Sequence, residues 1–126
     1  MIYGIGTDIV RVARMQEDIE RFGERFAERI LTSDELQEYR RNANKAGFLA
    51  RRFAAKEAAA KALGTGFSQG VQIRDIEVAH DPQGKPMLSF SGRARQFMRE
   101  KGITVSHISL ADEQDHAVAF VTLEIG

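Results

Sequence analysis

Hydrophobic and polar positions change their spacing soon after the N-terminus, from a strand pattern to a helical one. Residues 2–10 (IYGIGTDIV) predict a β-strand in which Gly4 and Gly6 leave one face bare, so that another backbone or a ligand can approach closely. Farther on, apolar residues recur every three or four positions across residues 12–30, which predicts a single helix with one buried stripe. The stripe consists of Val12, Met15, Ile19, Phe22, Phe26 and Ile30.

Two more helices follow, and each is marked by residues at its ends. Thr32 and Glu35 have the spacing of a capping box and predict the start of a helix. Polar residues and a glycine in 42–47 (NANKAG) interrupt that helix, and the alanine-rich residues 48–63 predict the next one. Gly64 can adopt the left-handed conformation that commonly ends a helix.

The second half of the chain has the period of strands. Apolar residues alternate in short runs, with an irregularity at residues 74–75 and a turn at residues 81–84 (DPQG). The expected elements are a hairpin of strands 71–80 and 87–90, a short helix over 91–98 capped by Ser91 and ended by Gly102, and a second hairpin of strands 105–110 and 117–125. This combination predicts an α+β fold with helices packed on a small antiparallel sheet.

The composition narrows the chemistry. The 126 residues, 43% of them hydrophobic, suffice for one soluble domain with its own core. There is no cysteine, which excludes disulfides, thiolate nucleophiles and cysteine zinc sites and favours a hard cation held by oxygen or imidazole. Eighteen basic and eighteen acidic residues cancel, which argues against general nucleic-acid binding. The apolar runs are too short for a membrane span and no signal-peptide pattern is present, so a cytoplasmic location without a membrane partner is expected.

Asp8, Glu57 and Lys61 are the candidate chemical groups. Glu57 and Lys61 lie one turn apart among alanines, where a ligand can reach the carboxylate, and Asp8 lies near the end of the glycine-rich strand. Two carboxylates from separate elements can bind Mg²⁺ and leave coordination positions for phosphate oxygens, while a lysine neutralises a leaving phosphate. The residues alone also allow an ordinary Glu–Lys pair and a helix-capping aspartate. Likewise, His107 fits either a structural strand histidine or a phosphate contact.

Five segments give the sequence its resemblance to a known family. They are IYGIGTDIV at residues 2–10, FAERILTSDEL at 26–36, FLARRFAAKEAAAKALGTG at 48–66, GKP at 84–86 and HISLADE at 107–113. In this order and spacing they make the chain similar, over essentially its full length, to the bacterial holo-acyl-carrier-protein synthases, the small phosphopantetheinyl transferases. The resemblance implies the phosphopantetheinyl transferase fold in one domain, residues 1–126, and a homotrimer with each active site between two subunits.

The resemblance also implies a reaction. The 4'-phosphopantetheine arm of coenzyme A is transferred to a serine of an apo acyl carrier protein in fatty acid biosynthesis, and adenosine 3',5'-bisphosphate is released. Asp8 and Glu57 are then the expected Mg²⁺ ligands, together with the pyrophosphate of coenzyme A, and Lys61 acts at that pyrophosphate. Glu57 is also expected to be the general base for the serine, directly or through a water. The positions implied to contact the rest of coenzyme A are Arg52 and His107 near its 3'-phosphate and Lys85 and Pro86 beside its adenine.

The first predicted helix carries a candidate surface for the carrier. At about 100° per residue, the arginines at positions 11, 14, 21, 25 and 29 gather on one stripe and the glutamates mostly on another. In the family that this sequence resembles, the helix binds an acidic helix of the carrier, which implies contacts from Arg14, Arg21, Arg25 and the apolar Phe26. The alternative is a solvated helix with intrahelical ion pairs.

Two other classes of function use the same features. A metal-dependent nucleotide phosphohydrolase would need the same carboxylates and lysine but no surface for a carrier. A non-catalytic oligomeric module would bind coenzyme A without consuming it, since a small α+β fold does not by itself fix a chemistry.

Overall fold

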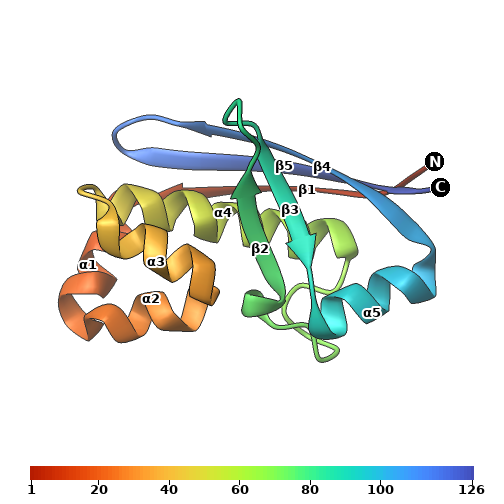
Figure 1. Ribbon diagram of the computed structural model, residues 1–126, viewed down its shortest axis with the longest axis horizontal. Helices are drawn as coiled ribbons and strands as arrows, with labels where there is room; N and C mark the ends of the chain where they lie inside the picture. Colours follow the sequence, from red (N-terminus) through yellow and green to blue (C-terminus); the bar gives the residue numbers. More distant parts are fainter.

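In the computed structural model, which describes residues 1–126, two antiparallel sheets and five α-helices make up the fold (Figure 1). The three-stranded sheet has the strand order β1 (Ile2–Arg11), β5 (His116–Ile125) and β4 (Ile103–Asp112), and a separate hairpin joins β2 (Ile76–His80) to β3 (Pro86–Phe90). The helices are α1 (Val12–Phe22), α2 (Glu24–Ile30), α3 (Ser33–Arg41), α4 (Lys45–Leu63) and α5 (Gly92–Lys101). This architecture confirms the predicted α+β class.

Helix α4 lies along one face of the three-stranded sheet, with α1–α3 at one end of the molecule and α5 at the other (Figure 1). Its alanines are buried, and all of them except Ala60 belong, together with the inner face of the sheet, to one core cluster of 26 buried residues. A Cβ atom at Gly4 would clash with the carbonyl oxygen of Ala62, and one at Gly6 with that of Ala58. The bare strand face predicted from the glycines is therefore real, and the backbone that approaches it is α4.

The helix predicted over residues 12–30 is wrong in one respect, because it is two helices. Gly23 separates α1 from α2 with φ 68° and ψ −155°, a conformation that residues with a Cβ rarely adopt. The Phe22 and Phe26 rings stack across the break with their centroids 6.4 Å apart. Arg25 and Phe26 thus belong to a different helix from Arg14, and the single arginine stripe does not exist.

Several of the other predicted element ends are confirmed, whereas the starts of α4, β2 and α5 differ from the prediction. Thr32 and Glu35 form the predicted capping box, and Gly64 ends α4 in the left-handed conformation. Helix α4 begins earlier than predicted because the Asn44 side chain accepts a hydrogen bond from the Gly47 amide at 3.0 Å and so caps it. The strand predicted over residues 71–80 is shorter than expected, because the irregularity at 74–75 is a short 3₁₀ helix, Ile73–Asp75, and β2 begins only at Ile76. Ser91 precedes α5, but its hydroxyl donates to the carbonyl of Asp75 and makes no cap.

A buried ion pair joins α3 to α4 inside the core. The Lys56 ammonium is fully buried and donates to Glu35 Oε1 at 2.6 Å and to the Ile30 carbonyl at 2.7 Å. The Glu35 carboxylate also accepts from the backbone amides of Thr32 and Val78, each at 2.9 Å. Burial lowers the pKa of Lys56, and the Glu35 carboxylate opposes that shift. One carboxylate thereby ties together the end of α2, helices α3 and α4, and strand β2.

None of the helices has both the length and the apolar composition that a membrane-spanning segment needs.

Substitution of Lys56 tests this connection. Lys56→Met should lower the free energy of unfolding by about 3 kcal/mol, because it leaves a buried carboxylate without its main counter-charge. Lys61→Met is the matched control on the same helix: Lys61 is 52% exposed, so its loss should cost less than about 1 kcal/mol. Urea denaturation of both variants measures the difference. Equal losses would mean that the buried pair adds no more stability than the exposed one.

Candidate active site

Asp8, Glu57 and Lys61 meet where β1 crosses α4. Asp8 is in register with Ala119, which is fully buried on the sheet face that α4 covers, so its carboxylate points toward the helix. Lys61 Nζ lies 3.0 Å from Asp8 Oδ1 and donates to the Thr7 carbonyl at 3.1 Å. Glu57 lies one turn before Lys61 on the same helix. The structure therefore brings together the three residues that the sequence singled out.

The electrostatics of this cluster suit a cation. Partial burial raises the pKa of Glu57 above its usual value, the nearby Asp8 carboxylate raises it further, and Lys61 and Arg14 oppose the shift. Asp8 on the strand and Glu57 on the helix repel each other, and a hard divalent ion bound to their oxygens would relieve that repulsion. There is no group of three or more potential metal ligands, so the remaining positions of such an ion would have to be filled by water or a ligand.

The predicted carrier residues lie on the helices at the start of the chain. The Arg14 guanidinium lies over the Phe53 ring of α4, 5.6 Å from its centroid, and its charge reaches Glu57. Arg21 covers the ring of Phe22 at 5.1 Å. Arg25 is exposed on α2 and Phe26 is half-buried, beyond the break at Gly23. Arg14 is therefore the predicted carrier residue that lies closest to the carboxylate cluster.

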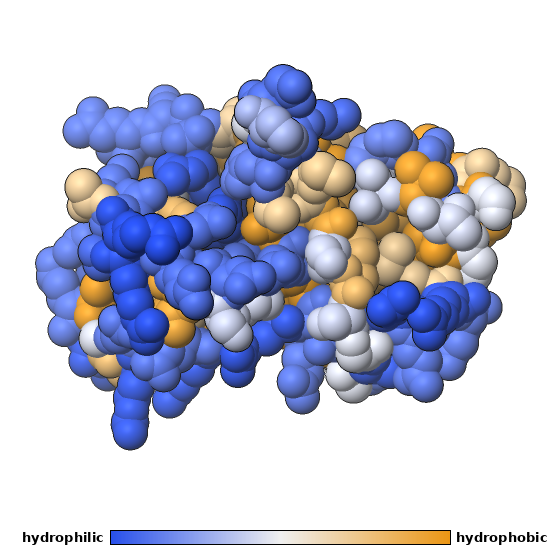
Figure 2. All heavy atoms as spheres, in the orientation of Figure 1, coloured by the Kyte–Doolittle hydropathy of each residue, from blue (hydrophilic) through white to orange (hydrophobic).

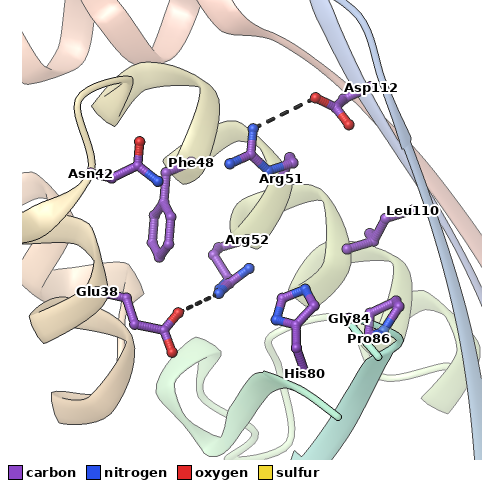
Figure 3. A pocket seen from close by; sticks show the side chains of 10 residues that line it. All are labelled: Glu38, Asn42, Phe48, Arg51, Arg52, His80, Gly84, Pro86, Leu110 and Asp112. Carbon is purple, nitrogen blue, oxygen red and sulfur yellow. Dashed lines mark hydrogen bonds and ion pairs between the residues drawn. The ribbon is translucent and has the colours of Figure 1, made fainter. Parts of the chain in front are cut away.

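Arg52 lines a cavity of about 400 Å³ between α3, α4 and the turn of the β2–β3 hairpin (Figure 3). The Arg52 guanidinium lies over the Phe48 ring at 4.4 Å and donates to Glu38 Oε2 at 2.8 Å. His80 faces it from the hairpin, and burial followed by the charge of Arg52 lowers the pKa of His80. The cavity is polar and its lining includes two arginines, the nearly buried Arg52 and the more exposed Arg51, which suits a phosphorylated ligand.

A second cavity of about 330 Å³ brings together Lys85, Pro86 and His107. Pro86 also lines the first cavity, so the two adjoin at this residue. The His107 ring is largely exposed, and its Nε2 lies 3.0 Å from Glu124 Oε2. Four of the five residues predicted to bind coenzyme A thus gather in two neighbouring cavities, and the fifth, Lys61, lies at the carboxylate cluster.

The structure does not bring His107 to the Asp8–Glu57 cluster of its own chain. His107 is in register with Thr122, which pairs with Ile5 on the exposed face of the sheet, whereas Asp8 points to the face under α4. Because successive strand residues face opposite sides, the two groups lie on opposite faces of the same sheet. A single chain therefore exposes His107 and the Asp8 carboxylate on different sides of the sheet.

Among the residues of the first cavity that sequence reasoning missed, three surround Arg52. Phe48 stacks on Arg52, Glu38 pairs with Arg52, and His80 faces them from the hairpin. The spacing of four between Phe48 and Arg52 was a readable signal, since residues i and i+4 of a helix share a face. Glu38 and His80 come from other elements, and only the fold shows that they meet.

Comparisons with known proteins identify the family of this chain. The family model for the 4'-phosphopantetheinyl transferase superfamily matches residues 4–121. Over 126 residues the chain is 56% identical to a holo-[acyl-carrier-protein] synthase of Halorhodospira halophila, with full coverage of both chains. A crystal structure of the corresponding synthase from Neisseria meningitidis is 45% identical, with a TM-score of 0.93 over 98% of this chain and 99% of that one.

A third relative was solved with a ligand. The synthase of Bacillus anthracis, in complex with CoA (3',5'-ADP), is 38% identical, with a TM-score of 0.83 over 100% of this chain and 99% of that one. Identity at this level over whole chains, on the same fold and with the same family model, leaves one assignment. This chain belongs to the 4'-phosphopantetheinyl transferase superfamily and, within it, to the holo-[acyl-carrier-protein] synthases.

Proposed function

We propose that this protein transfers 4'-phosphopantetheine from coenzyme A to a serine of an apo acyl carrier protein, in a Mg²⁺-dependent reaction that supports fatty acid biosynthesis in the cytoplasm. The serine oxygen forms a bond to the phosphorus of the pantetheine arm, the pyrophosphate bond breaks, and adenosine 3',5'-bisphosphate leaves while the serine proton is taken up by a base. The proposal depends above all on the meeting of Asp8 with Glu57 and Lys61. All three residues belong to one domain, residues 1–126, in this proposal.

Each residue of the cluster has a role in this reaction. Asp8 and Glu57 would hold the divalent cation, which when bound neutralises charge on the pyrophosphate of coenzyme A. Lys61 has an exposed ammonium beside Asp8 and adds a positive charge for the departing bisphosphate. Glu57 is the general base for the serine proton, and partial burial suits a carboxylate to that task.

The two adjoining cavities would hold the nucleotide half of coenzyme A. We assign Arg52 and His107 to the 3'-phosphate and Lys85 and Pro86 to the adenine. A related synthase from Bacillus anthracis was solved in complex with CoA (3',5'-ADP), which supports coenzyme A as the ligand. Coenzyme A would extend from there to a carboxylate cluster. Since His107 and Asp8 of one chain face opposite sides of the sheet, this assignment is consistent with a site shared between two subunits.

Removal of a carboxylate tests the metal site and the reaction together. Asp8→Asn and Glu57→Gln keep the side-chain shape but remove a charge, and each should lower transfer by about a hundredfold or more. The assay mixes protein, coenzyme A, Mg²⁺ and apo carrier and follows the mass of the carrier. Chelation of Mg²⁺ should have the same effect, and unfolding midpoints serve as the control for folding.

The same assay separates the alternative functions. Coenzyme A cleaved without a change in carrier mass would indicate a phosphohydrolase, and binding without cleavage would indicate a non-catalytic module. Near wild-type transfer by either variant at limiting Mg²⁺ would contradict the metal site.

We assign the carrier to the surface formed by α1 and the start of α2, although the break at Gly23 divides it. Arg14 and Arg21 remain on one helix, and Arg25 and Phe26 approach from the next. Hydrophilic side chains dominate the half of the molecule that holds α1–α3 (Figure 2). The arginines of this surface, of which Arg14 acts electrostatically on Glu57, would guide an acidic helix of the carrier so that its serine reaches the cluster.

Charge reversal tests this surface. Arg14→Glu combined with Arg21→Glu should raise the Michaelis constant for the carrier by about tenfold and flatten its salt dependence, because steering between exposed charges is lost. The affinity for coenzyme A, measured by calorimetry, should stay unchanged. Arg99→Glu on α5, at the opposite end of the molecule, is the matched control (Figure 1). An unchanged Michaelis constant would mean that α1 is an ordinary solvated helix.

The homotrimer expected from the resemblance is supported by the outer face of the sheet. Ile5 and Ile9 of β1, Phe120 of β5 and Val105 of β4 are exposed on the face that α4 does not cover. An apolar sheet face open to water indicates an interaction surface, and association with two more copies would bury it. The number three rests on the resemblance alone.

Phe120→Glu tests the assembly. Wild-type protein should sediment with a mass near three times the 14.1 kDa chain, and Phe120→Glu should sediment as a monomer and lose transfer, because a shared site needs two subunits. Phe22→Glu replaces a phenylalanine of nearly equal exposure outside this face and should keep the wild-type mass. A Phe120→Glu variant with an unchanged mass would place the subunit contact elsewhere.

A further inference from the structure

Arg52 has contacts from fixed core residues and one contact from an exposed residue. Its side chain is 4% exposed, lies on the Phe48 ring at 4.4 Å, and has Nε 3.6 Å from Glu35 Oε2. Glu35 is committed to Lys56 and to two backbone amides, so it cannot leave. Phe48 and Glu35 therefore fix the plane and position of the guanidinium from inside the core.

The remaining contact of Arg52 comes from a residue that is free to move. Glu38 accepts from Arg52 Nη2 at 2.8 Å, its side chain is 47% exposed at the cavity wall, and it makes no other hydrogen bond or ion pair (Figure 3). Of the two terminal nitrogens of Arg52, Nη1 makes no hydrogen bond or ion pair within the chain, and the buried Nε has no hydrogen-bond partner. The cavity thus offers an incoming anion one open nitrogen of Arg52, while Glu38 covers the other.

We infer that Glu38 is a displaceable stand-in for the phosphate of the ligand: it covers Arg52 Nη2 in the empty cavity and is exchanged for that phosphate on binding. The inference rests on the assignment of the 3'-phosphate of coenzyme A to Arg52. A phosphate that took both terminal nitrogens would form the two-pronged contact that arginine favours, and a glutamate left in place would repel it. Glu38 thereby lowers the affinity for coenzyme A, and for the released bisphosphate, which carries the same 3'-phosphate.

The test compares two ligands that differ only at this position. Glu38→Gln should bind coenzyme A about five- to tenfold more tightly than wild-type protein in calorimetry, because a repelling charge is removed. Its affinity for 3'-dephospho-coenzyme A should be unchanged. Asp34→Asn is the matched control: it removes the same charge from an exposed position on the same helix, one turn away, and should alter neither affinity. Adenosine 3',5'-bisphosphate should also inhibit the Glu38→Gln variant more strongly than wild-type protein.

The outcomes separate this inference from the proposed function. If wild-type protein prefers coenzyme A to the dephospho form but Glu38→Gln binds it no more tightly, the inference is overturned and the proposed function stands. An equal gain with 3'-dephospho-coenzyme A, or with Asp34→Asn, would overturn it as well, since the effect would then be one of general charge. Wild-type protein that bound neither ligand would contradict both.

Discussion

The buried contact between Lys56 and Glu35 is the constraint on which the site depends. It fixes α4 against α3, the end of α2 and β2 at once, because each of these elements gives the ion pair a donor or an acceptor. Consecutive residues of a helix point about 100° apart, so a Lys56 directed into the core turns Glu57 toward β1 and Asp8. Arg52, one turn earlier, reaches the same Glu35 and faces the cavity. One buried carboxylate thus sets the direction of the residues on α4 that carry chemistry.

The close approach of β1 to α4 is a second requirement of the site. Gly4 and Gly6 let β1 lie directly on the α4 backbone, and the small side chains of the α4 alanines also let the helix lie close to the strand. At a larger separation, Asp8 would not reach Lys61 at 3.0 Å. The glycines before Asp8 therefore serve the site through packing, and they need not contact a ligand to be required.

Local signals in the sequence predicted most of the fold, and the family resemblance pointed to the meeting of Asp8 with Glu57 and Lys61, whereas other contacts between distant elements were not predictable. The capping box at Thr32, the end of α4 at Gly64 and the bare face of β1 depend on neighbouring residues or on residue type, and all were confirmed. The break at Gly23 was missed because the apolar spacing continues across it. Burial of Lys56 and the pairing of Glu38 with Arg52 depend on which helices meet, and periodicity within one segment carries no such information.

The strand order has a consequence for how the chain folds during synthesis. Strand β1 lies at the edge of the sheet, and its only partner is β5, so residue 2 pairs with residue 124 and the two chain ends lie side by side (Figure 1). While the ribosome makes the rest of the chain, β1 has an unsatisfied backbone edge and the exposed side chains of Ile5 and Ile9. Contacts between residues so far apart in the sequence form late, and folds that depend on them form slowly. Until β5 is available, β1 therefore has no partner in the sheet, and Asp8 is held in a complete sheet only after β5 has paired with it.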